Sequence, residues 1–162
     1  MILKLNRDIR TRDSKMIRIG TVEEAYEVFL NIPELDRYLS LQEMKDKLSG
    51  EHLIIVAEIE AHLVGFKIGY QKNNSEYYSW LGGVIPFYRR SGIAQKLLDF
   101  QEDRVKRSGF DYISVKSMNR FPSMLRLLIK NSYKIKEVEF FGDSERERIH
   151  FVKALGEITR KI

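Results

Sequence analysis

Three strand-like segments in succession constrain the fold of this chain more than any other feature. These segments are rich in β-branched and aromatic residues and are separated by short polar stretches. They are Leu53–Ile59, Leu63–Tyr70 and Glu76–Ile85. A hairpin is expected at the first of these stretches, Glu60–His62. Because consecutive strands joined by short turns pair antiparallel, this half of the sheet should be antiparallel.

Two helices are expected before these strands. Met16–Gly20 alternates between apolar and polar residues and is predicted to be a first strand. Thr21-Val22-Glu23-Glu24 is a capping-box sequence, which marks the start of a helix, and Pro33 interrupts the apolar pattern that follows it. A second helix is predicted over Glu34–Leu48, where a serine and a glycine follow.

Helices and strands alternate in the remainder of the chain. The apolar spacing predicts helices over Gly92–Arg107 and Pro122–Lys130, and strands over Tyr112–Val115, Tyr133–Phe141 and Arg148–Ala154. The resulting order, β α α β β β α β α β β, predicts an α/β (α+β) fold. Its central sheet should be mixed and mostly antiparallel, with about six or seven strands, about four flanking helices and one β-α-β crossover.

The length and composition fit one globular domain. The chain has 162 residues, of which 43% are hydrophobic and 31% are charged. Residues 15–162 are therefore predicted to form a single domain, and residues 1–14 an N-terminal extension with an extra strand near Ile2–Leu5. No apolar run approaches the ~20 residues that span a bilayer, so no membrane partner is expected.

The residue types also disfavour several chemistries. The chain has no cysteine, which excludes disulfides, thiolate zinc sites and a cysteine nucleophile, and which fits a cytoplasmic location. Its three histidines, His52, His62 and His150, lack the spacing of metal ligands, so no metal is expected. The net charge of +5 favours anionic partners in general, but the basic residues are too dispersed for a continuous nucleic-acid track.

The segment from Val84 to Ala94 carries the most specific chemical information. It joins the end of a strand to the start of a helix and contains Arg89, Arg90 and Gly92. The first N–H groups of a helix have no intrahelical acceptor and lie at the positive end of the helix dipole, and glycine allows a ligand to approach the backbone closely. The segment therefore predicts a site for a phosphate-like anion; an ordinary basic helix cap is the alternative.

This segment also resembles a known family signature. Arg89-Arg90-Ser91-Gly92-Ile93-Ala94 is similar to the Arg/Gln-x-x-Gly-x-Gly/Ala signature of the GNAT N-acetyltransferases. As in that family, it follows a strand that ends in Val-x-Pro, here Val84–Pro86, and precedes an amphipathic helix. Asn119 follows the next strand, and Asn131-Ser132-Tyr133 resembles the family's Lys-x-Gly-Phe sequence. The resemblance extends over about residues 16–154.

The resemblance implies an acyltransferase that uses acetyl-CoA as its co-substrate. In the family, the pyrophosphate of the cofactor binds the backbone amides of the signature loop, and the pantetheine arm pairs with the preceding strand. An asparagine after the next strand commonly contacts this arm. By position, the implied cofactor-binding residues are Gly83, Val84, Ile85, Arg89, Arg90, Ser91, Gly92, Ile93, Ala94 and Asn119.

The implied reaction moves an acetyl group from the thioester to a primary amine by direct attack in a ternary complex. The backbone N–H of Val84 is the expected oxyanion donor, and Glu76 is a candidate general base or a solvated carboxylate. The family's tyrosine acid corresponds by position to Leu128, which cannot donate a proton. Glu34 and Asp36 are candidates for binding the cationic amine of a small molecule or a peptide.

Two other classes of function stay open. A catalytically weak acyl-CoA-binding module of the same fold is supported by the leucine at the acid position. A nucleic-acid-binding protein is suggested by Phe87 and Tyr88 beside Arg89 and Arg90, since basic and aromatic side chains together suit single strands, but the dispersed charge disfavours it. By analogy with the family, the last two strands are a candidate homodimer interface.

Overall fold

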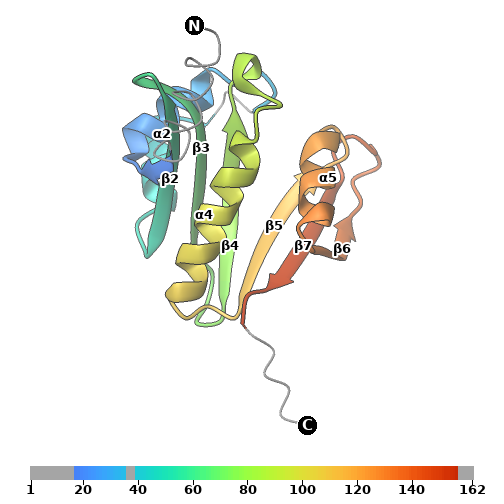
Figure 1. Ribbon diagram of the computed structural model, residues 1–162. Coiled ribbons are helices and arrows are strands. Elements are labelled where there is room, and N and C mark those ends of the chain that lie inside the picture. Colours follow the sequence, from blue (N-terminus) through green and yellow to red (C-terminus); the bar gives the residue numbers. More distant parts are fainter. Residues whose placement is uncertain (1–16, 36–38, 157–162) are drawn as a thin grey trace, which may run out of the picture. The chain divides into compact units, whose positions relative to one another are not determined.

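Seven strands and four α-helices follow one another in the described part of the chain, residues 17–35 and 39–156 of a computed structural model (Figure 1). The strands form one sheet in the order β1-β2-β3-β4-β5-β7-β6. The elements are β1 (Ile17–Ile19), α2 (Val22–Leu30), α3 (Leu41–Lys47), β2 (His52–Ile59), β3 (His62–Gln71), β4 (Glu76–Val84), a 3₁₀ turn η1 (Pro86–Tyr88), α4 (Ile93–Arg107), β5 (Tyr112–Met118), α5 (Pro122–Lys130), β6 (Lys134–Glu139) and β7 (Arg148–Ala154).

The pairing of the strands confirms the predicted mixed sheet. β1 pairs antiparallel with β2, and β7 pairs antiparallel with both β5 and β6. β4 and β5 are parallel, because the helix α4 connects them as a crossover. The predicted hairpin between β2 and β3 turns at Glu60 and Ala61, whose φ angles of 49° and 66° are those of a type I′ turn.

The contacts divide the chain into two compact units, which we describe separately. Unit 1 comprises residues 1–69 and 81–101, and unit 2 comprises residues 70–80 and 102–162. In unit 1, Phe29 of α2 makes an edge-to-face contact with Phe66 of β3, and a Cβ at Gly65 would lie 3.1 Å from Leu97 of α4. Because adjacent strand residues point to opposite faces, α2 and α4 cover opposite faces of β3.

In unit 2, the helix α5 packs beside β5 (Figure 1). Leu128 of this helix is fully buried. The carboxylate of Glu102, near the end of α4, accepts a hydrogen bond from the Tyr133 hydroxyl at 2.9 Å. The same carboxylate forms an ion pair with Lys153 of β7 at 2.9 Å. These contacts attach the end of α4 and the start of β6 to the strand β7.

Local signals predicted most element boundaries. The capping box at Thr21 is confirmed: its side chain accepts from the Glu24 N–H at 3.2 Å, and the Glu24 carboxylate accepts from the Thr21 N–H at 3.0 Å. The predicted start of the second helix is wrong, because the helix begins at Leu41 and not at Glu34. Ser40 is its N-cap, and its hydroxyl accepts from the Glu43 N–H at 3.1 Å.

Two predictions concern residues that the structure does not describe. The extra strand near Ile2–Leu5 and the start of the first strand at Met16 both lie outside the described residues. Within the described part of the chain, no helix is both long enough and apolar enough to cross a membrane.

Candidate active site

The signature loop has an unusual backbone conformation where it enters α4. Arg90 and Gly92 have φ angles of 62° and 83°, so two residues lie in the left-handed region within three positions. A Cβ built on Gly92 meets no atom within 4 Å, so glycine is required here by the backbone angle and not by crowding. The hydroxyl of Ser91 donates to the Tyr88 carbonyl at 2.5 Å, which closes the loop on itself.

The helix that follows the loop supplies anion-binding groups. α4 begins at Ile93 and runs for 15 residues, long enough to carry a full helix dipole. The first turn of α4 presents backbone N–H groups toward the loop. This first turn contains no acidic residue. The N-terminus of α4 therefore carries a partial positive charge, and its first turn has no carboxylate that would repel an anion. Both properties suit the binding of a pyrophosphate.

Arg89 fastens the loop to the rest of unit 1. Its guanidinium donates from Nη1 and Nη2 to the two carboxylate oxygens of Glu34, at 2.8 and 2.7 Å, and from Nε to the carbonyl oxygen of Val84 at 3.0 Å. The hydrogen bonds from Arg89 lower the pKa of Glu34 to about 2. The structure thus engages Arg89 and Glu34 with each other, although sequence reasoning placed them in the cofactor and acceptor sites respectively.

At the end of β4, the backbone N–H of Val84 points away from the neighbouring strand β3. The N–H of Ile85 donates to the Val64 carbonyl of β3 at 2.8 Å. Because successive N–H groups of an extended strand point to opposite sides, the N–H of Val84 is directed away from β3. An amide in this position is suited to bind an oxyanion.

Gly83 has a packing reason for being glycine. A Cβ at this position would lie 2.6 Å from Cδ1 of Ile32, a buried side chain of unit 1. A glycine pair in a strand predicts either a bulge or a close approach to the backbone, and here the approaching group is a core isoleucine.

Glu76 lies at the opposite end of β4 from Val84. Its carboxylate accepts from the Ser114 hydroxyl and from the Lys72 ammonium, both at 3.0 Å. Burial works to raise the pKa of Glu76, but these two hydrogen bonds and the positive charges of Lys72 and Lys136 together lower the pKa below its usual value. A carboxylate stabilised in this way is a weaker base than a free one.

The remaining predicted residues are dispersed. Asn119 follows β5, and its side chain donates to the Ser144 carbonyl at 2.7 Å. Leu128, which sequence reasoning placed at the position of the family's tyrosine acid, is completely buried in α5, and its side chain has no proton to donate. Asp36 lies outside the described residues.

Sequence reasoning missed a cluster of polar and aromatic groups on the strands of unit 2. His150 of β7 bonds Glu139 of β6, and the Lys116 ammonium of β5 lies 3.7 Å from the same carboxylate. Lys116 also lies 5.9 Å above the ring of Tyr78, and burial raises the pKa of Tyr78 to about 12. Tyr78 packs edge-to-face on Tyr70 at 5.5 Å. The sequence offers one signal for this cluster, the alternation of residues 76, 78 and 80 on one face of β4.

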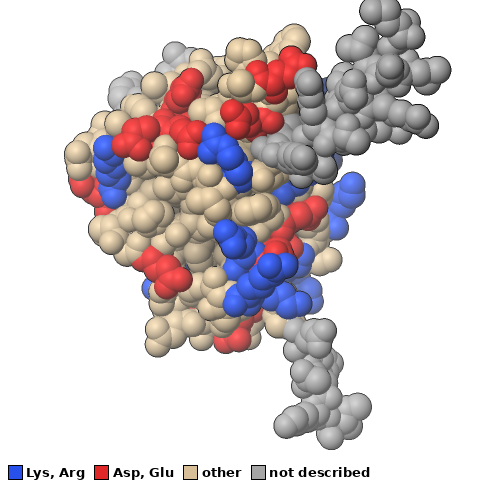
Figure 2. Space-filling view, turned by 60° about the vertical axis from the view of Figure 1, so that its left-hand side comes forward, with Lys and Arg blue, Asp and Glu red and all other residues tan. Residues whose placement is uncertain are grey.

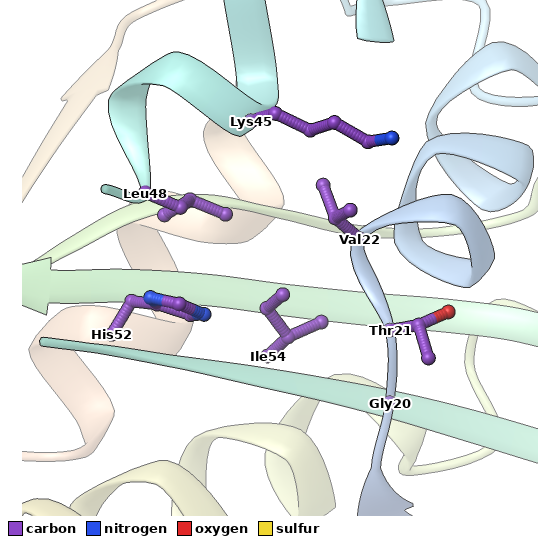
Figure 3. Close-up of a pocket in the computed structure, with 7 residues that line it drawn as sticks. All are labelled: Gly20, Thr21, Val22, Lys45, Leu48, His52 and Ile54. Atoms are coloured by element: carbon purple, nitrogen blue, oxygen red, sulfur yellow. The ribbon is translucent and has the colours of Figure 1, made fainter. Parts of the chain in front are cut away.

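A hollow in unit 1 is separate from these residues (Figure 3). It has a volume of about 340 Å³ and contains none of the predicted site residues. Lys45 at its edge forms an ion pair with Glu23 at 2.9 Å, and the ring of His52 bonds the Gly50 carbonyl at 2.8 Å. The lining residues are Gly20, Thr21, Val22, Lys45, Leu48, His52 and Ile54.

His, Asp and Glu side chains are scattered over the described residues. In the part of the chain that the structure describes, no group of three or more His, Asp or Glu side chains could hold a metal ion. Figure 2 shows one face of the molecule, on which both basic and acidic side chains are exposed among uncharged residues.

Comparisons with known structures identify the fold. The ribosomal-protein-S18-alanine N-acetyltransferase from Escherichia coli matches with a TM-score of 0.78 at 13% identity, over 90% of this chain and 97% of that chain. Ard1 from Thermoplasma volcanium matches with a TM-score of 0.74 at 18% identity, over 87% and 97%. The aminoglycoside 6′-N-acetyltransferase from Enterococcus faecium matches with a TM-score of 0.70 at 17% identity, over 86% and 97%.

Sequence comparison identifies a family to which the chain is similar, but no individual curated relative. No curated protein matches the chain significantly. Residues 20–126, well over half of the chain and including the whole signature loop, match the Acetyltransferase (GNAT) family. With the mixed seven-stranded sheet and four helices of its described residues and with its loop before α4, the chain belongs to the GNAT family of acetyltransferases.

Proposed function

We propose that this protein transfers an acetyl group from acetyl-CoA to a primary amine by direct attack in a ternary complex. The observation that carries the proposal is the loop before α4. Its residues Arg90 and Gly92 adopt left-handed backbone angles, and it leads directly into the N-terminus of a 15-residue helix. Family membership supplies the reaction class, and this geometry supplies a place for the pyrophosphate.

The backbone is the main cofactor-binding element in this proposal. The amides of Arg90 to Ala94 bind the pyrophosphate, and the side chain of Arg89 keeps the loop in place through Glu34 and the Val84 carbonyl. Glu34 therefore acts on the cofactor site indirectly. The strand residues Gly83 to Ile85 run along the pantetheine arm in this proposal.

The chemistry follows from the amide of Val84. The amine nitrogen attacks the thioester carbonyl carbon, and the carbonyl oxygen becomes an oxyanion that accepts a hydrogen bond from the Val84 N–H. The C–S bond then breaks, the nitrogen gives up its proton to water, and the coenzyme A thiolate takes a proton from water. Holding both substrates together provides much of the rate enhancement. The proposal gives Glu76 no part, since it lies at the other end of β4 and is bound by Lys72 and Ser114.

One observation favours a second candidate, an acyl-CoA-binding module without turnover. Leu128 is fully buried and leaves the family's acid position without a proton donor. The two functions differ in a single measurable property, because a binding module would bind acetyl-CoA without releasing coenzyme A.

Calorimetric titration with acetyl-CoA tests the cofactor site. Gly92→Glu places a carboxylate where the pyrophosphate is proposed to bind, and we expect at least a tenfold loss of affinity. Gly109→Glu is the matched control, since Gly109 also has a positive φ, of 90°, and also meets no atom within 4 Å of a built Cβ. A folded wild type that does not bind acetyl-CoA, or a Gly92→Glu variant that binds as well as the control, would overturn the proposal.

Turnover is measured by the release of coenzyme A. Because the chain has no cysteine, a thiol-reactive dye reports coenzyme A without background from the protein. The structural neighbours suggest two classes of acceptor for the first panel, aminoglycosides and peptides with an N-terminal alanine. Amine-dependent release supports the acetyltransferase. Binding without release by any amine of the panel supports the module.

A further inference from the structure

One charged residue is buried in the part of the chain that the structure describes. Lys67 of β3 is 5% exposed, whereas the other described Lys, Arg, Asp and Glu side chains are at least partly exposed. Lysine is among the residues that are least often buried, because its ammonium gives up hydration in the interior. The position of Lys67 therefore calls for a specific explanation.

Lys67 points to the face of β3 that α4 covers. A Cβ built on Gly65 would lie 3.1 Å from Leu97 of α4. Since residues two apart in a strand point to the same face, Lys67 also points toward α4. The apolar residues between the sheet and α4 form one cluster, none of whose side chains titrates. They are Ile55, Ala57, Val64, Val84, Ile93 and Leu97.

The side chain of Lys67 lies over the neighbouring strand β4. The N–H of Ile85 in the β3–β4 pair donates to the Val64 carbonyl at 2.8 Å. In an antiparallel pair, this register brings Lys67 opposite Gly82. A Cβ built on Gly82 would lie 3.3 Å from Cγ and 3.6 Å from Nζ of Lys67. The ammonium therefore reaches β4 at a residue that has no side chain of its own.

This part of β4 is the strand segment that we assign to the reacting thioester. Val84, the proposed oxyanion donor, follows Gly82 by two residues, which is about 6.5 Å along a strand. The sulfur that leaves is bonded to the same carbon atom as the oxyanion. Lys67, Gly82 and Val84 all belong to unit 1.

The proposed reaction has a need that an ammonium at this place can meet. Breakage of the C–S bond leaves a negative charge on the sulfur. Leu128, which sequence reasoning placed at the position of the family's acid, has no proton to donate. An ammonium stabilises a neighbouring negative charge most strongly where water is excluded, and it has a proton to give.

We propose that the Lys67 ammonium stabilises the thiolate of coenzyme A and donates the proton that this thiolate takes up. An N–H bond of Lys67 breaks as the S–H bond forms, so the ammonium becomes a neutral amine and the thiolate becomes a thiol. Water then returns a proton to the amine. This inference rests on the proposed function and replaces only water as the source of the thiol proton.

Titration of bound coenzyme A tests this role without an acceptor amine. The ultraviolet absorbance of the thiolate is measured as the difference between complexes with coenzyme A and with desulfo-coenzyme A, so that the signals of the tyrosines cancel. Because the chain has no cysteine, the remaining signal comes from the coenzyme. An opposite charge nearby lowers the pKa of an acid by about 1–3 units, so the bound thiol should titrate about one unit or more below free coenzyme A.

Variants of Lys67 separate its charge from its proton. Lys67→Met keeps the length of the side chain and removes the charge, so the lowered pKa of the thiol should be lost. With an amine that the protein accepts, this variant should release coenzyme A about tenfold more slowly or worse. Lys67→Arg keeps a charge that does not deprotonate, so it should retain the lowered pKa without restoring the rate. Lys153→Met is the matched control, since Lys153 is a partly buried lysine of β7 with a side chain 24% exposed.

The outcomes distinguish this inference from the proposed function. A wild type that binds coenzyme A without lowering the pKa of the thiol would overturn the role of Lys67 alone, and this titration decides even where a variant does not fold. A folded Lys67→Met variant that keeps the lowered pKa, or a control that loses it equally, would do the same. Acetylation of Lys67 itself, detected by mass spectrometry, would also overturn the role, because Lys67 would then be an acceptor. A folded wild type that binds neither acetyl-CoA nor coenzyme A would overturn the proposed function and this inference together.

Discussion

Replacing Gly83 by alanine should force a clash with a specific atom. The new Cβ would lie 2.6 Å from Cδ1 of Ile32 but 3.7 Å from the next carbon atoms, which belong to Ile32 and Leu35. Ile32 is 3% exposed, so its side chain has little room to move. Inserting a methyl group into a packed site of this kind costs about 1–3 kcal/mol of unfolding free energy. We expect the Gly83→Ala variant to lose an amount in this range.

The matching substitution removes the clashing atom. Ile32→Val deletes Cδ1 and should by itself cost about 0.5–1.5 kcal/mol. In the double variant the alanine Cβ occupies part of the space that Cδ1 leaves, so the two losses should not add. The interaction between the substitutions should be at least about 0.5 kcal/mol, which is the lower end for residues in direct contact.

Equilibrium unfolding in guanidinium chloride, followed by circular dichroism, measures all four free energies. The dependence on denaturant should be the same for each variant, which shows that only stability has changed. Gly50→Ala serves as the control, because a Cβ at Gly50 meets no atom within 4 Å. Strict additivity of Gly83→Ala and Ile32→Val, or a Gly83→Ala variant as stable as the Gly50→Ala control, would refute the packing argument.

Three further predictions concern stability. Arg89 lowers the pKa of Glu34 to about 2. The charged pair therefore stabilises the fold above the pKa of the unfolded state, and this stabilisation is lost as the pH falls. The difference in unfolding free energy between the wild type and Glu34→Gln should shrink from about pH 5 to pH 2. Leu128→Ala should cost about 2–5 kcal/mol in denaturant titrations, whereas truncation of its exposed neighbour Ile129 should cost far less. Thr21→Ala should lower the free energy of unfolding by about 1 kcal/mol, through loss of the capping bond to the first turn of α2.

Elements marked by local chemistry could be predicted from the sequence. The capping box at Thr21 and the proline at the start of α5 act within a few residues, and both helices begin where these signals predict. The segment from Glu34 to Ser40 shows the opposite case. Glu34 is held by Arg89, 55 residues away in the chain, and not by a helix. A pattern of apolar residues carries no information about such a distant ion pair.

The candidate site shows the same division between local and distant information. The signature loop is one continuous segment, so strand, turn and helix could all be predicted from its residues. The roles of the acidic side chains depend on partners that the sequence does not mark. Glu76 is bound by Ser114, 38 residues away, and Glu139 is bound by His150 through strand pairing. The histidine therefore gave no motif, although it is one of the polar groups that unit 2 brings together.

The first residue of the signature acquires a different meaning from these contacts. Sequence reasoning counts Arg89 as a positive charge for the pyrophosphate, yet its guanidinium donates to Glu34 and to the Val84 carbonyl. Its bond to Val84 joins the loop to the strand residue whose amide is the proposed oxyanion donor. An arginine in this position can thus couple two parts of the site, the anion-binding turn and the end of β4. In the proposed function, the positive charge for the pyrophosphate comes from backbone dipoles and from Arg90, and the side chain of Arg89 provides the rigidity that those dipoles need.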